Sequence, residues 1–297
     1  AFATIVAGIV AKKGLSGLAL ATVIAGVLII IMGIFKLGNL IKFIPFSITT
    51  GFTAGIALTL VIGQLKDFAG VKYMNGESPI ESLEKLSAFV KNISTVNVSA
   101  IIVGVVCLVI LFVMPKFFDK IPASLLAVVV GTAMVKGLGM NVNTIGDLYS
   151  VNSGLPHFVL PEFSFKLAAD VMPDAVTIAV LAGIESLLSC VVADGMTGGH
   201  HRSNTELIAQ GTANIGSALF GGIPATGAIA RTAANIKNGG RTPVAGMVHS
   251  VVLAALMKYA AFIPMPAIAA ILINVAYNMC GWKTFVNLVK TSPKSDV

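Results

Sequence analysis

A carboxylate and a hydroxyl group lie four residues apart near the centre of an apolar stretch. Glu185 and Ser189 fall within residues 174–193, and this spacing places both side chains on one face of a helix. A carboxylate inside a membrane costs at least about 2.5 kcal/mol on insertion scales, so it normally faces a bundle interior or a wet cavity. We therefore expect both residues to line a functional site. The alternative is that Glu185 only hydrogen-bonds a neighbouring helix.

A second candidate is an apolar run that cannot be one helix. Residues 207–230 carry no charge, but residues 220–224 read Phe-Gly-Gly-Ile-Pro, in which flexible glycines and a proline without an N–H group interrupt a helix. We expect a short helix over 225–236, whose free N–H groups attract an anion. Arg231 would add a full positive charge. The alternative is a simple kink, with Arg231 extending to the membrane surface.

Other reactive residues lack the spacing that chemistry requires. His200 and His201 are adjacent, and no Cys or Glu stands at ligand spacing, so we expect a solvated loop and no metal ion. Cys107, Cys190 and Cys280 lie in apolar stretches without CxxC spacing, which is typical of small core residues. No span contains a nucleophile-base pair or a metal-ligand cluster. We therefore expect no enzyme activity and no cofactor.

The composition indicates that most of the surface faces lipid. Of the 297 residues, 56% are hydrophobic and 11% are charged, whereas soluble domains have about 25% charged residues. A net charge of +7 would suggest a nucleic-acid partner in a soluble protein. Here the basic residues lie singly or in pairs between apolar runs, as in proteins that orient themselves in a membrane. The sequence therefore predicts an all-α polytopic membrane protein, surrounded by lipid, with no nucleic-acid partner.

The apolar runs set the expected helices, because about 20 helical residues cross a hydrocarbon core. Residues 1–11 are expected to be part of a span and 12–14 a connection. An amphipathic helix is expected over 80–90, an irregular outer connection over 136–173 and an interfacial segment over 282–290. The full spans are predicted over 15–35, 44–65, 98–114, 122–135, 174–193, 243–257 and 266–279.

The order of the motifs along the chain resembles the sulfate permease (SulP) family of anion transporters. The resemblance covers essentially the whole chain. The segments that carry it are 182–189 (AGIESLLS), 192–198 (VADGMTG), 204–211 (NTELIAQG), 228–235 (AIARTAAN), 240–243 (GRTP) and 45–64, which includes GFTAGI.

This resemblance implies a fold of fourteen segments in two inverted repeats of seven, divided into a core and a gate domain. The fold contains discontinuous half-helices. Residues 1–297 would form an incomplete transmembrane transport domain, from the third segment to the twelfth. The first two segments, the last two and a cytoplasmic STAS domain would lie outside this chain.

The resemblance also implies where an anion binds, between the starts of the third and tenth segments and beside the eighth. Members that carry bicarbonate with sodium have Asp at the position of Glu185 and Thr at the positions of Ser189 and Ile229. This difference favours proton coupling or anion exchange over sodium coupling. Carried onto this sequence, the site comprises Phe2, Glu185, Ser189, Gly227, Ala228, Ile229, Ala230 and Arg231.

We therefore expect a secondary active transporter of sulfate, bicarbonate or a dicarboxylate that works by an elevator-like movement of core against gate. Proton-coupled symport and anion exchange both stay open. We expect a homodimer in a bacterial inner (plasma) membrane. Two alternatives remain. One is a nucleobase permease of the same overall fold, which also uses a carboxylate in its eighth segment, and the other is a non-transporting membrane sensor.

Overall fold

The computed structural model describes residues 2–43, 46–73, 79–117, 122–151, 154 and 156–280. Side chains are described for these residues except 2–4, 41–43, 46–50, 52 and 230. Throughout the described ranges the secondary structure is helical, and the only β pairing is an isolated bridge between Thr144 and Pro264. The chain divides into two compact units, and the first consists of residues 1–49 and 155–247.

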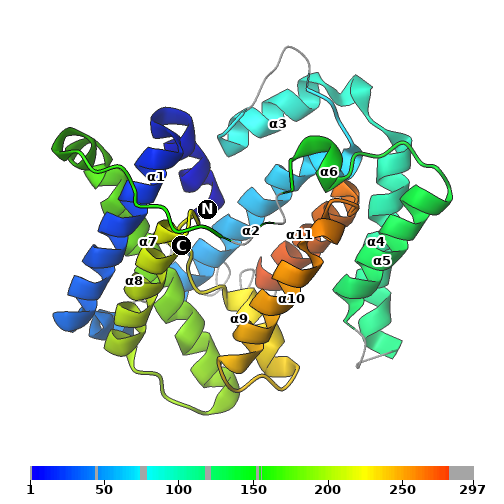
Figure 1. Ribbon diagram of the computed structural model, residues 1–297. Helices are drawn as coiled ribbons and strands as arrows, with labels where there is room; N and C mark the ends of the chain where they lie inside the picture. The colour runs from blue at the N-terminus through cyan, green and yellow to red at the C-terminus, as the bar shows by residue number, and fades with distance from the viewer. Residues whose placement is uncertain are drawn as a thin grey trace. The chain divides into compact units, whose positions relative to one another are not determined.

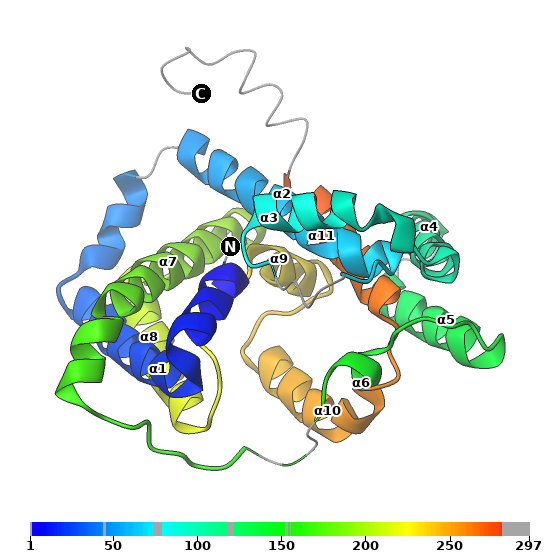
Figure 2. The same ribbon diagram turned by 90° about the horizontal axis from the view of Figure 1, so that it is seen from above.

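The first unit contains the helices that carry the residues of the predicted site. They are α1 (Phe2–Ile34), η1 (Leu37–Phe43), α7 (Phe165–Thr197), α8 (Ser203–Leu219) and α9 (Ile229–Lys237). Helix α1 packs along both α7 and α8, and α9 packs against α7 (Figures 1 and 2).

Helix α1 is two helical stretches joined at Gly14. The backbone there has φ 70° and ψ −176°, a conformation that interrupts the helix and that essentially only glycine adopts. Beside this turn, the Lys13 ammonium lies 2.7 Å from a carboxylate oxygen of Asp174 in α7. The predicted connection at residues 12–14 is therefore confirmed, and an ion pair attaches it to α7.

Helices α1 and α8 approach closely because glycines lie at their interface. A Cβ atom added to Gly26 would lie 2.7 Å from the carbonyl oxygen of Gly211, and one added to Gly33 would lie 2.8 Å from that of Asn204. Small residues allow such backbone approach in membrane bundles. The contact fixes α8, and with it the residues that precede the break before α9.

The second unit consists of residues 50–154 and 248–297. Its main core lies between α4, α5 and α11, where Cys107 is fully buried and its Sγ lies 3.3 Å from the carbonyl oxygen of Ala127. The helices with residues in this unit are α2 (Phe46–Ala69), α3 (Ser82–Lys91), η2 (Ile93–Thr95), α4 (Val98–Phe117), α5 (Ala123–Gly137), α6 (Ile145–Leu148), α10 (Val244–Ala260) and α11 (Met265–Cys280).

Two predicted boundaries were wrong. The irregular connection expected over 136–173 contains α6 and the first turns of α7, which begins at Phe165 and continues through Pro173. Pro173 does not end this helix, because proline is tolerated within helices of membrane bundles. The short helix expected from residue 225 begins at Ile229. The interfacial segment predicted over 282–290 lies outside the described residues.

Three described helices are long and apolar enough to cross a membrane. These are Ile5–Ile34, Val98–Phe117 and Phe165–Thr197. Shorter apolar helices are Ala123–Gly137, Val244–Ala260 and Met265–Cys280. Apolar helices shorter than a full span, present beside the long ones, are expected where some segments are discontinuous.

Candidate functional site

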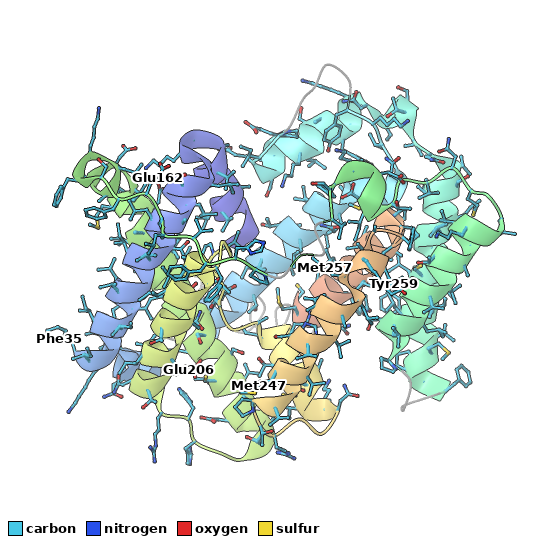
Figure 3. The ribbon with its side chains drawn as sticks, in the orientation of Figure 1. Phe35, Glu162, Glu206, Met247, Met257 and Tyr259 are labelled. Carbon is cyan, nitrogen blue, oxygen red and sulfur yellow. The ribbon has the colours of Figure 1, made fainter. Side chains whose placement is uncertain are left out.

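The middle of α7 is tied by hydroxyl groups to two other helices of the first unit. Ser186 is 1% exposed, and its Oγ donates a hydrogen bond of 2.7 Å to Oε1 of Glu206, a residue of the first turn of α8 that is labelled in Figure 3. Ser189 is 4% exposed, and its Oγ lies 2.9 Å from Oγ1 of Thr232 in α9. One helical turn of α7 therefore contacts both α8 and α9.

Glu185 lies on the same turn of α7 and is partly buried. Among the residues that the structure describes, none donates a hydrogen bond to its carboxylate or forms an ion pair with it. The alternative in which Glu185 serves packing by hydrogen-bonding a neighbouring helix therefore has no supporting contact in these ranges. A partly buried carboxylate with no hydrogen-bond or ion-pair partner among the described residues is chemically suited to exchange a proton or to act on a bound ion.

The chain between α8 and α9 is non-helical from Phe220 to Ala228 (Figure 1). Gly221 adopts a positive φ of 70° directly after α8 ends. The predicted break is therefore confirmed. The segment is held in place by its neighbours, because Oγ1 of Thr226 donates a 2.9 Å hydrogen bond to the carbonyl oxygen of Ala182 in α7.

Helix α9 begins with uncapped amide groups. Ala228 occupies the N-cap position without a side-chain hydrogen bond, and the first backbone bond of the helix runs from the Thr232 amide to the Ala228 carbonyl at 2.8 Å. The amides of residues 229–231 precede that bond and have no partner within the helix. Such a helix start carries about half a positive charge and favours a bound anion.

Gly227 brings this helix start against α7. A Cβ atom added there would lie 3.1 Å from the Cα of Ser186 and 3.3 Å from the Cβ of Ser189. Both contacts are tighter than a side chain normally makes, so the absence of a side chain permits the approach. The predicted residues Gly227 to Arg231, which span the end of the break and the start of α9, are therefore brought close to Ser189 of α7.

Arg231 lies in the first turn of α9 and is exposed. No carboxylate of the described residues lies within ion-pairing distance of its guanidinium group. The structure records no contact between Arg231 and Glu185, so their proximity stays a prediction. An exposed arginine beside free amides adds positive charge where an anion would bind.

Two predicted site residues, Phe2 and Ala230, are described by their backbones. Phe2 is the first residue of α1, but its side chain lies outside the described part, as does that of Ala230. Their backbones are placed at the starts of the two helical segments from which the site was predicted. Their contact with an anion, like that of the other six residues, stays a prediction.

Sequence reasoning missed polar residues that organise the break. Neither Glu206 nor Asn214 is among the predicted site residues, and Asn214 lies in the uncharged run 207–230. Glu206 accepts a hydrogen bond from Ser186, and Asn214 donates one to the Ala225 carbonyl. In each pair the two residues are more than ten positions apart in the chain. The signal that could have found Asn214 is its amide in the middle of a span, because a buried polar group must be hydrogen-bonded.

The two histidines behave differently. His200 is exposed, in agreement with a solvated loop, but Nδ1 of His201 lies 2.7 Å from Oδ2 of Asp194, and its Nε2 lies 2.9 Å from Oγ of Ser203. His201 therefore stabilises the turn between α7 and α8. Within the described ranges, no three His, Cys, Asp or Glu residues gather as a metal site would require.

The comparison with protein families gives one match over the whole chain. The model of the sulfate permease family matches residues 1–297. Among individual proteins, YvdB of Bacillus subtilis (strain 168), named as a candidate sulfate transporter, is 42% identical over 296 residues. The bicarbonate transporter BicA of Picosynechococcus is 36% identical over 287 residues. These alignments cover 98% and 94% of this chain, but only 56% and 50% of the relatives.

Solved structures share the fold. The transmembrane domain of a cyanobacterial bicarbonate transporter BicA superposes with a TM-score of 0.82 at 32% identity, covering 99% of this chain and 75% of that one. Murine Slc26a9, an anion transporter in its inward-facing state, gives 0.79 at 22% identity, covering 96% and 48%. The expected inverted-repeat transporter fold, with discontinuous helices, is thereby confirmed. The chain spans about half the length of the curated relatives it matches.

Proposed function

This chain belongs to the sulfate permease family and is an integral membrane protein, and we propose that the protein containing it is a secondary active transporter of small anions. The observation that carries the proposal is the uncapped start of α9 at Ile229, two residues after Gly227, which lies against Ser186 and Ser189 of α7. Free N–H donors of this kind can hold a small anion that is bound without a covalent bond. The family membership favours this function over the nucleobase alternative.

The anion would be held mainly by backbone N–H groups. We infer that the amides at the start of α9 bind its oxygen atoms, while Arg231 supplies charge and Ser189 holds α9 against α7 through Thr232. Ala228 and Ile229 contribute backbone and no polar side chain, so the site recognises charge and size. Sulfate, bicarbonate and a C4-dicarboxylate all meet that requirement, and the names of the relatives support the first two.

Coupling is assigned to Glu185. Its carboxylate has no partner among the described residues, so it can take up a proton when the anion binds and release it when the anion leaves. Proton-coupled symport and anion exchange are both consistent with this role. Sodium coupling is disfavoured because Ile229 offers no side-chain oxygen, and a sodium ion requires several oxygen ligands.

Transport would proceed by an elevator-like movement. All the residues predicted to bind the anion belong to the first compact unit, so we propose that this unit is part of a core domain that moves against a gate domain. The complete protein would be a homodimer in a bacterial plasma membrane. It would contain further segments and a cytoplasmic STAS domain beyond this chain.

The test is uptake into liposomes that contain the full-length protein. Labelled sulfate, bicarbonate and succinate would be offered with and without proton or sodium gradients. We expect saturable uptake of at least one anion, with a rate that responds to a proton gradient or to an internal exchangeable anion. Absence of flux for all three would favour the sensor alternative, and competition by uracil would favour a nucleobase permease.

Arg231 gives the sharpest variant for this assay. Replacing it by Gln removes the charge beside the α9 amides, so we expect the KM for the anion to rise about tenfold or more, a loss of at least about 1.4 kcal/mol. Lys237→Gln is the matched control, because it removes a positive charge from the far end of the same helix. An unchanged KM in Arg231→Gln would remove this residue from the site.

A further inference from the structure

A buried polar side chain of α8, that of Asn214, lies against the break. It is 1% exposed. Its Oδ1 accepts a 2.8 Å hydrogen bond from the Ala225 amide, and its Nδ2 donates a 2.9 Å hydrogen bond to the Ala225 carbonyl. The same Nδ2 donates to the Gln210 carbonyl at 3.0 Å, and Nε2 of Gln210 also donates to the Ala225 carbonyl.

Asn214 supplies hydrogen-bond partners to peptide groups that the break leaves outside any helix. Ala225 lies between two helices, so its N–H and C=O groups have no helical partner, and water is scarce inside a membrane bundle. A peptide group that has neither water nor a protein partner costs more free energy than a normal hydrogen bond contributes. A carboxamide presents a donor and an acceptor in one plane, so Asn214 meets both groups of Ala225 as a neighbouring strand would.

The pairing also sets the position of the helix start that follows. Asn214 holds Ala225 from α8, and Thr226, the next residue, bonds to the Ala182 carbonyl of α7. Gly227 then contacts Ser186. Two consecutive residues are thus fixed to two different helices, and only two residues separate them from Ile229, where the free amides begin.

We propose that Asn214, assisted by Gln210, is a positioning residue for anion binding: it fixes the broken segment to α8 so that the amides at the start of α9 converge on the anion. Asn214 does not touch the anion in this proposal. The proposal rests on the function proposed above, because it assigns to Asn214 the geometry of the same site. It predicts that α8, the broken segment and the α9 start move as one body.

The test uses the full-length transporter with Asn214→Leu, which keeps the approximate volume and removes both hydrogen-bonding groups. Thr212→Val is the matched control, because Thr212 is on the same helix and its Oγ1 bonds only to the Ile208 carbonyl in the helix itself. Hydrogen exchange of a peptide covering 220–231 is measured together with sulfate or bicarbonate uptake. We expect faster exchange in this peptide and a KM raised about tenfold in Asn214→Leu, and no change in Thr212→Val.

A merely structural role would lower the amount of folded transporter and leave the KM of the folded fraction unchanged. Faster exchange with an unchanged KM, or unchanged exchange, therefore overturns the proposal. If Asn214→Leu does not fold, Gln210→Leu replaces it, because this variant removes only one donor to the Ala225 carbonyl. It should raise both the exchange rate and the KM by a smaller factor, and the same two results would overturn the proposal.

The two proposals fail in different ways. If the wild-type protein carries none of the three anions, the proposed function is wrong and the positioning role for anions falls with it, whatever the exchange rates. If Arg231→Gln impairs anion uptake while Asn214→Leu has the wild-type KM, the anion site stands and only the role of Asn214 is excluded.

Discussion

Several residues of the predicted anion site contribute backbone atoms and no polar side chain. At Gly227 the chain comes within 3.1 Å, measured from an added Cβ, of a backbone atom of Ser186, and the neighbouring Ala228 and Ile229 carry no polar side chain. Backbone amides at a helix start are fixed in direction by the helix itself, so they need no side-chain ordering when a ligand binds. Selectivity in such a site comes from how closely the surrounding chain packs.

Substitution of Gly227 by Ala tests this dependence on packing. The added methyl group meets the Cα of Ser186, which cannot rotate away, so we expect a cost of about 1–3 kcal/mol and a clearly raised KM for the anion. Gly216→Ala in α8 is the control, because a Cβ there meets nothing within 4 Å. The KM for anion uptake is measured for both variants after purification and reconstitution. Equal kinetics in the two variants would contradict the packing argument.

At the scale of elements, the turn at Gly14 determines where the first stretch of α1 ends. Its φ of 70° and ψ of −176° belong to a region that L-residues avoid, while a Cβ at this position would meet nothing within 4 Å. The constraint is therefore entirely in the backbone. It allows the second stretch of α1 to run along α7 and α8 independently of the direction of the first.

We predict that Gly14→Ala destabilises the protein by about 1–3 kcal/mol through backbone strain. Gly8→Ala is the matched control for Gly14→Ala, because Gly8 lies in the helical stretch before the turn and a Cβ added there would also meet nothing within 4 Å. Alanine favours a helix, so Gly8→Ala should be neutral or stabilising by up to about 1 kcal/mol. Thermal unfolding of the full-length protein in detergent measures both. A neutral Gly14→Ala would show that the turn is not required.

The elements also show which features could be predicted from sequence. The break at Gly221 and Pro224 and the connection at Gly14 were predictable, because glycine and proline act locally on the backbone. The start of α9 was placed four residues too early, at Ala225, because nothing local shows that this residue pairs with Asn214 on another helix. Local rules give the existence of an element, and tertiary hydrogen bonds set where it begins.

On the scale of the whole molecule, every residue predicted to bind the anion belongs to the first compact unit, although these residues are separated by up to 229 positions along the chain (Phe2 to Arg231). The candidate residues themselves could be assigned because their motifs resemble those of a family. Their mutual support could not, because the bonds from Ser186 to Glu206 and from Ser189 to Thr232 join positions 20 and 43 residues apart. A ligand bound to this unit should therefore stabilise several helices together.

This linkage gives a prediction for the intact protein. A ligand that binds only the folded state adds RT ln(1 + [L]/Kd) to the free energy of unfolding, which is about 2.7 kcal/mol at a hundredfold excess over Kd. We expect the transported anion to raise the midpoint of thermal unfolding of the full-length transporter, compared with chloride at equal ionic strength. In Arg231→Gln the same anion concentration should give a much smaller rise. An equal rise in both proteins would mean that the stabilising anion binds elsewhere, because a change in Kd at the site must change the linked stability.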